Sequence, residues 1–473
     1  MSIQPAPVAV LDFAPLPVAV TPSSALLSSD AGLLLIRQFD ERLGFTAQLA
    51  AALEDPRDPF RIEHTVPEML RARLYGLLAG YEDQNDHDAL RTDATFKLVA
   101  GRLPTDPDLA SQPTLSRWEN AVTIPSLKRL RDVLIDQFIA SFAAPPRQLL
   151  LDLDAVDDPT HGQQQLSLFH GYYEQHQYFP LLITCADNDL IVALSLRHGT
   201  AHAALGADDD LEYVVRRLRA VWPGVAIEVR GDAGFGVPWM YAVGERLGLR
   251  YTFGLAGNAA LHRLSEALLA QAVAQFAATG QPQRLFDRFW YQAGSWDEPR
   301  LVVVKAEANA QGTNRRYTVT NRGGAALYPE AAYDAYIQRG ESENRNKEFK
   351  ALAGDRLSDH RFLANYLRLY LHAAALNLLV RLRQRVALPE PEPAPEPAPA
   401  APAARATAAR RRHNARRRRD PLGEGQPATW QLRLIKVAAE VLVSCRRVVV
   451  RLSSSWPYLD HFRSVSAAVA AGP

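Results

Sequence analysis

The segment that most constrains this fold is the run Leu149-Leu150-Leu151-Asp152-Leu153-Asp154, where acids alternate with leucines inside an apolar stretch. A short, nearly continuous apolar run is typical of a strand that is buried on both faces. Burying a carboxylate is costly unless another charge compensates it. The run therefore predicts a buried strand of a layered α/β sheet, with acids at its carboxyl end.

Strand and helix patterns after this run predict a mixed α/β sheet. Short apolar runs predict strands at residues 172–176, 181–184, 190–196, 225–229 and 251–255. Helical spacing predicts helices at 210–221, 238–247 and 261–278, and again from about 341 to 385. Between these helices, strand-like segments at 289–291, 301–306 and 316–320 predict a β-rich insertion.

The flanking segments differ from the sheet in pattern. Residues 30–142 repeat apolar side chains every three or four positions, which predicts a small all-helical domain. The chain therefore divides into 1–28, a flexible arm; 29–145, a helical domain; 146–284, the first part of the α/β core; 285–325, the β-rich insertion; 326–387, the C-terminal helices of the core; 388–429, a linker rich in Pro and Arg; and 430–473, a basic C-terminal module.

Composition excludes several classes of protein. Hydrophobic residues make up 47% and charged residues 22%, as in ordinary globular proteins. The two cysteines, Cys185 and Cys445, form no Cys-x-x-Cys pair, which argues against a disulfide framework or a structural zinc site. No stretch of eighteen apolar residues is free of charge, so we expect no membrane span and a cytoplasmic protein.

Three acids form a candidate metal site. Asp154 and Asp232 each end a predicted strand, and Glu343 lies on a predicted helix. Open α/β sheets place their ligands at the carboxyl ends of their strands. Three oxygen donors leave coordination positions for water and phosphate, which suits Mg²⁺, and a pair of such ions promotes phosphoryl transfer. A turn-forming Asp is the alternative interpretation for each acid alone.

The helix around Glu343 carries the most specific pattern, Tyr336-x2-Arg339-x3-Glu343-x6-Lys350. Offsets of 3, 7 and 14 residues keep these side chains near one helical face. The carboxylate can then bind metal while the cations contact DNA phosphates or hold the acid. A solvated charged helix is the alternative, because Glu341, Arg345, Lys347 and Glu348 crowd the same segment.

This signature resembles that of the DDE transposases of bacterial insertion sequences, in the group built around insertion sequence four. The segments 151–164, 169–173, 230–235 and 338–345 are similar to the branch named for insertion sequence thirteen-eighty. The similarity runs from about residue 30 through residue 385.

The resemblance implies a ribonuclease-H-like core in which Asp154, Asp232 and Glu343 bind metal, supported by Tyr336, Arg339 and Lys350. It implies Mg²⁺ as cofactor, for which Mn²⁺ can substitute. The partners it implies are double-stranded DNA, as element ends and target, and a second copy in a homodimer on nucleoid-associated DNA. Val156 stands where many relatives have threonine, and Asp152 remains an alternative to Asp154 as first acid.

Further DNA contacts are expected outside the triad. The resemblance implies that an aromatic of the β-rich insertion, Trp290 or Trp296, holds a flipped base, although core packing is the common role of such a residue. Arg117, in a helix over 111–119, suits a helix-turn-helix that reads the element end, and helix packing is its alternative. Arg411 and Arg417 belong to a run of seven arginines that suits phosphate contacts, or a solvated tail.

Together these features predict a cut-and-paste transposase. Two alternatives stay open: a metal-dependent DNA nuclease on the same core, and an inactive DNA-binding protein derived from a transposase.

Overall fold

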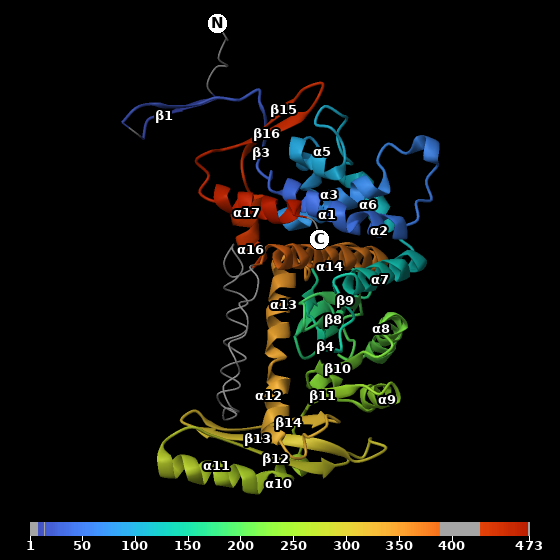
Figure 1. Cartoon of the computed structure of the whole chain (residues 1–473), viewed down its shortest axis with the longest axis vertical. Coiled ribbons are helices and arrows are strands. Elements are labelled where there is room, and N and C mark those ends of the chain that lie inside the picture. The colour runs from blue at the N-terminus through green and yellow to red at the C-terminus, as the bar shows by residue number, and fades with distance from the viewer. Residues whose placement is uncertain (1–7, 14, 388–425, 472–473) are drawn as a thin grey trace.

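The computed structural model describes residues 8–13, 15–387 and 426–471 of the chain. A helical unit and a C-terminal unit lie at one end of the molecule, and a large sheet extends away from them (Figure 1). The long helix α14 (Phe362–Val386) lies between the helical unit and the sheet (Figure 1). Its residues are apolar on all sides and mostly buried, as expected for a helix inside a core.

The large sheet has the strand order β12-β13-β14-β11-β10-β4-β8-β9 within the described residues. β10 pairs in parallel with both β4 and β11, whereas β8 and β9 add antiparallel strands. The predicted mixed α/β sheet is therefore confirmed. Its central strands are β4 (Gln148–Ala155), β8 (Leu181–Cys185), β9 (Ile191–Ser195), β10 (Ala226–Gly231) and β11 (Arg250–Leu255), with helices α8 (Ala207–Val221) and α9 (Pro238–Arg246) between them in the chain.

The β-rich segment extends this sheet and does not interrupt it. β12 (Gln283–Tyr291), β13 (Arg300–Asn309) and β14 (Gly312–Thr320) form antiparallel pairs, and β14 pairs with β11. One helix was expected over 261–278, but the chain forms α10 (Ala259–Leu264) and α11 (Glu266–Thr279). The break falls at Ser265, whose hydroxyl donates to the Leu261 carbonyl at 2.8 Å.

One predicted strand is wrong. Residues 172–176 were expected to be extended, but β6 (Leu168–His170) and β7 (Gln175–Tyr178) are joined by a turn at residues 171–174. Glu174 in this turn has a φ of 53°, in the left-handed region. With β5 (Asp158–Pro159) the two strands form a small separate sheet that follows β4 in the chain.

Helices form where the apolar spacing of residues 30–142 predicts them. They pack on α14, so the helical unit and the sheet share one hydrophobic core. The elements are α1 (Leu33–Leu43), α2 (Phe45–Ala52), the 3-10 turn η1 (Pro59–Arg61), α3 (Val66–Ala79), α4 (His87–Leu90), α5 (Ala94–Ala100), α6 (Gln112–Asn120) and α7 (Ile124–Ile139).

A buried ion cluster fastens the helical unit to α14. Glu119 of α6 is fully buried and accepts from Arg73 of α3 at 2.8 Å and from Arg368 of α14 at 2.5 Å. Burial disfavours the ionised carboxyl, but the two arginines outweigh burial and lower the pKa of Glu119 to about 2.

A small sheet joins a segment near the N-terminus to the C-terminal unit. Residues 1–28 were expected to be a flexible arm, yet the described part contains β1 (Ala9–Leu11), β2 (Val18–Val20) and β3 (Leu26–Ser28). β1 pairs with β2, and β3 pairs with β15 of the C-terminal unit. That unit comprises α16 (Pro427–Trp430), the π-helical turn η3 (Gln431–Ile435), β15 (Ala439–Val443), β16 (Val448–Leu452) and α17 (Leu459–Ala470).

Contacts beyond this sheet hold the C-terminal unit on the helical unit. Lys436 pairs with Asp30 at 2.7 Å and lies over the ring of Tyr81. Most of the predicted linker, residues 388–425, lies outside the described residues. Among the helices that the structure describes, none is both long and apolar enough to cross a bilayer.

The ion cluster predicts a stability change. Replacing Glu119 with Gln leaves buried Arg73 without its counter-charge, whereas Arg368 keeps Asp359 at 3.2 Å, and should lower the free energy of unfolding by about 3–5 kcal/mol. Because the folded pKa is lowered from 4.5 to about 2, the contribution of Glu119 is complete above pH 4.5 and lost as the pH falls toward 2. Urea unfolding measured from pH 7 to pH 2.5 tests both statements.

The exposed carboxylate Asp460 is the matched control for this measurement, since its pair with Arg463 lies on the surface. Asp460→Asn should change the stability by less than about 0.5 kcal/mol. Equal effects of the two substitutions would contradict a structural role for the Glu119 cluster.

Candidate functional site

Two acids lie side by side at the carboxyl edge of the sheet. Asp154 is the penultimate residue of β4, and Asp232 directly follows β10. The two strands are parallel neighbours, with Leu153 opposite Gly231, which places the following acids next to each other. Asp232 begins the short turn η2 (Ala233–Phe235), and its carboxylate accepts the backbone N–H of Gly234 at 2.8 Å.

The buried carboxyl of Asp154 is poorly compensated. Burial raises its pKa to about 6, and the charge of Asp232 adds to this, although Arg339 opposes it. The nearest cation is Arg339, at 3.6 Å from Oδ2. Two adjacent carboxylates without a full counter-charge offer oxygen ligands of the kind that divalent cations bind.

Asp152 lies two residues earlier on the same face of β4, and its environment is different. It is fully buried and accepts two bonds from the guanidinium of Arg230 on β10, at 2.7 and 2.9 Å. Arg345 approaches the same carboxylate at 3.4 Å. Its charge is therefore balanced within the fold, which favours Asp154 as the acid available for metal.

The four signature residues do not share one helix: they span α12 (Pro329–Ile337) and α13 (Gly340–Ala351), which run nearly end to end (Figure 1), and Arg339 caps the start of α13. Tyr336 belongs to α12, and the break falls at residues 338–339. The Tyr336 hydroxyl lies close to Gly254, where a Cβ atom would approach it to 2.8 Å. A side chain at position 254 would meet the backbone nitrogen of Ala233 as well, so glycine allows the close approach of both Tyr336 and the segment that carries Asp232.

Glu343 and Lys350 lie on α13. The Glu343 side chain is exposed. Lys350 does not extend freely toward solvent, because it pairs with Asp157 at 2.9 Å and with Asp355 at 3.5 Å. Lys350 therefore fastens α13 to the segment that follows β4.

Sequence reasoning missed three residues near the acids. Asn346 donates from Nδ2 to Oδ2 of Asp154 at 2.7 Å, and the Ser342 hydroxyl lies 3.3 Å from the same oxygen. Ser342 and Asn346 follow Arg339 by three and seven residues. This helical spacing is the sequence feature that could have indicated that the three side chains share one face. Tyr173 lies shortly after β6. Burial raises its pKa, and the negative charges of Asp157, Asp232 and Asp154 raise it further.

No group of three or more His, Cys, Asp or Glu side chains in the described parts of the chain is arranged tightly enough to hold a metal ion. Asp154 and Asp232 are adjacent, but with Glu343 they do not form such a group. Glu343 shares α13 with Ser342 and Asn346, the residues that contact Asp154.

The two tryptophans have different surroundings. Trp296 is 7% exposed and packs edge-on against Tyr241 and Tyr291, with Arg300 over its ring. Trp290 on β12 is 69% exposed. Trp296 is therefore a core residue, and Trp290 is the aromatic of this region that a base could reach.

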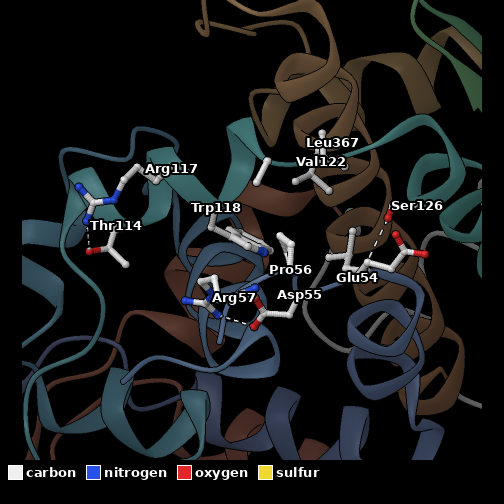
Figure 2. Close-up of a pocket in the computed structure, with 12 residues that line it drawn as sticks. Glu54, Asp55, Pro56, Arg57, Thr114, Arg117, Trp118, Val122, Ser126 and Leu367 are labelled. Atoms are coloured by element: carbon white, nitrogen blue, oxygen red, sulfur yellow. Dashed lines mark hydrogen bonds and ion pairs between the residues drawn. The ribbon is translucent and has the colours of Figure 1, made fainter. Parts of the chain in front are cut away.

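Arg117 and Trp118 lie beside a pocket of about 340 Å³ in the helical unit (Figure 2). The pocket lies between α6, the start of α7 and residues 53–57, and Leu367 of α14 also lines it. Trp118 faces Pro56 and Arg57, whereas Arg117 is exposed and donates to Thr114 at 3.1 Å (Figure 2). Arg411 and Arg417 lie outside the described residues.

The contrast between Asp152 and Asp154 predicts opposite effects on stability. Asp152→Asn removes the counter-charge of buried Arg230, whereas Arg345 keeps its pair with Asp189, and should cost about 3–5 kcal/mol. Asp154→Asn removes a charge that burial disfavours, so the melting temperature should stay unchanged or rise. Thermal unfolding without metal measures both, and a larger loss at Asp154 would contradict the distinction.

The tryptophans predict a second contrast. Trp296→Ala should lower the free energy of unfolding by about 3–5 kcal/mol, because it empties a packed aromatic site. Trp290→Ala should change it by less than about 0.5 kcal/mol, because its ring contacts solvent. Chemical denaturation of the two variants tests this pair.

Comparison with known proteins supplies the family. No curated protein matches the chain significantly. The family model described as "Transposase DDE domain group 1" matches residues 16–393, which include the sheet, both acids, and helices α12 to α14. Because this match covers most of the chain, the protein belongs to the DDE transposase family described as group 1.

Proposed function

We propose that this chain is a cut-and-paste DNA transposase of the insertion sequence four group, thirteen-eighty branch. It would bind the inverted repeats of its element, excise the element and join its 3′-hydroxyl ends to target DNA. The observation that carries the proposal is the pair Asp154 and Asp232 at adjacent strand ends, where the buried Asp154 lacks a full counter-charge.

The strand arrangement supports a ribonuclease-H-like core. In chain order the first five strands of the large sheet are β4, β8, β9, β10 and β11, and in space they run 3-2-1-4-5, with only the second antiparallel to its neighbours. This arrangement places the first and fourth strand ends together, and those ends carry the two acids.

The residues of the site have distinct parts in the proposed reaction. Asp154, Asp232 and Glu343 would hold a divalent metal, Mg²⁺ or Mn²⁺. When bound, the metal would neutralise phosphate charge and activate the attacking oxygen. Arg339 offsets part of the charge of Asp154 and interacts with Tyr336. Asn346 orients Asp154, and Lys350 fixes α13 through Asp157.

Each chemical step transfers a phosphoryl group between oxygens. In cleavage, water attacks the phosphodiester phosphorus and the bond to the 3′ oxygen breaks, which leaves a 3′-hydroxyl and a 5′-phosphate. In joining, that 3′-hydroxyl attacks a target phosphodiester and releases a new 3′-hydroxyl. Because bonds made and broken are alike, the protein mainly positions groups and neutralises charge.

The DNA would contact surfaces on either side of the acids. On β12, Arg284, Arg288 and Trp290 share one face and are exposed, which combines phosphate contacts with a stacking surface. Arg117 on the helical unit would contact the element end. Two ends are cut together, so a homodimer on chromosomal DNA in the cytoplasm is part of the proposal.

The side chain of Val156 is not a reason to expect an inactive protein. Val156 is buried in the core, and its backbone N–H donates to the Pro180 carbonyl at 2.9 Å. The structure therefore gives Val156 a packing role in the core.

A strand-transfer assay with the native element ends and Mg²⁺ tests the function. Asp154→Asn, Asp232→Asn and Glu343→Gln should each lower cleavage and joining by at least about a thousand-fold, because the metal ligands are lost. Glu266→Gln, on the exposed side of α11, should retain wild-type rates. Added Ca²⁺ should raise the melting temperature of wild type more than that of the Asp154 variant.

Two outcomes would redirect the proposal. Equal cleavage of unrelated DNA and of the element ends would identify a nuclease. End binding without cleavage by the wild type would identify an inactive DNA-binding protein.

A further inference from the structure

An apolar hairpin projects from the molecule. Its residues, 8–13 and 15–20, are called here the apolar arm, and they include the paired strands β1 and β2. The arm extends away from the body (Figure 1). Its large side chains face solvent: Phe13 is 81% exposed and Leu16 77%, and Val8, Val10, Leu11, Val18 and Val20 are exposed to a lesser degree. A patch of this kind on a folded chain marks an interaction surface.

The near absence of charged residues in the arm indicates which kind of partner it can bind. From residue 8 to residue 29 the sequence contains one acid, Asp12, and neither Lys nor Arg. DNA binding depends on cations that neutralise phosphates, so the arm is unsuited to DNA. A protein surface that offers apolar side chains and unpaired backbone groups is the matching partner.

This chain carries such a surface at the same end of the molecule. Among the residues that the structure describes, β16 is an edge strand of the sheet β16-β15-β3, and its residues Val448, Val449 and Val450 are only partly buried. The arm continues into β3, at the opposite edge of that sheet, with β15 between. The arm therefore leaves from the side of the sheet that is farther from its own β16.

We propose that the apolar arm of one copy pairs with the open edge of β16 in a second copy, and that two copies exchange arms reciprocally. Val18 of β2 then lies opposite Val449 of β16, and both strands gain backbone partners. A reciprocal exchange is closed by two-fold symmetry, which limits assembly to a dimer. The inference rests on the proposed function in that paired element ends require two copies.

Cross-linking between chains tests the pairing. Cys445 is exposed and is first replaced by Ser, while buried Cys185 is kept. Chains with Val18→Cys are mixed with chains carrying Val449→Cys, with and without element-end DNA, and oxidised gently. Since each chain has one accessible thiol, a disulfide joining positions 18 and 449 can form only between chains, and mass spectrometry of peptides identifies it.

The matched control is Phe60→Cys mixed with Val449→Cys, because Phe60 is 99% exposed but lies on η1, away from the arm. We expect the 18–449 linkage to exceed the 60–449 linkage by at least about ten-fold. Equal yields of the two linkages would overturn the proposal.

The oligomeric state supplies an independent test. Sedimentation velocity should show a wild-type dimer, and Val18→Asp with Val20→Asp should raise its dissociation constant by at least about ten-fold, because charges enter an apolar contact. Phe60→Asp should leave it unchanged. A wild type that is monomeric with and without DNA, or a double variant that still dimerises, would overturn the arm exchange.

Two further outcomes separate the alternatives. Co-sedimentation of wild type, but not of the double variant, with phosphatidylcholine vesicles would identify a membrane-binding arm and overturn the proposal. A wild-type dimer that depends on the arm but does not cut element ends would support the arm exchange and contradict the proposed function.

Discussion

The bidentate ion pair between Asp152 on β4 and Arg230 on β10 is the contact on which the geometry of the site depends. It joins two neighbouring strands inside the sheet, and Arg230 also donates to the Ala335 carbonyl of α12 at 2.8 Å. Arg345 brings α13 to the same carboxylate and continues to Asp189 at 2.6 Å. One buried carboxylate thereby fixes two strands and two helices.

Asp154 owes its position to this arrangement. It shares a face of β4 with Asp152, so the helices drawn toward Asp152 also cover Asp154. Asp154 receives an amide and a hydroxyl from α13 and one guanidinium, that of Arg339, at 3.6 Å. Asp152 is paired with two arginines, one of them at 2.7 Å, so Asp154 is the acid with less positive charge close to it.

The sequence predicts the central strands well, because buried strands are short apolar runs and each lies between clear helical patterns. It does not predict that β12 to β14 continue the same sheet, since that depends on pairing between β14 and β11 far apart in the chain. The hairpin after β5 was missed for a local reason: aromatic residues such as Tyr172 and Tyr173 favour strands, but here they form a turn.

Only part of the candidate site could be predicted from the sequence. Asp154 and Asp232 follow from their positions at strand ends, and the structure places them together. Asn346 could not be predicted, because its contact depends on how α13 is rotated against β4. Trp290 and Trp296 were equivalent in the sequence, and only the packing of Tyr241 from α9 on Trp296 distinguishes them.

The pairing of β3 with β15 also has a consequence for synthesis of the protein. β3 emerges early from the ribosome, whereas its partner strand is made about 410 residues later. At ordinary elongation rates β3 must wait roughly 20–80 s for that partner. The helical unit can fold in the meantime, but β3 gains its partner strand only when the chain is nearly full length. A prematurely ended chain would therefore carry an unpaired edge strand, a feature that promotes aggregation and recognition by chaperones.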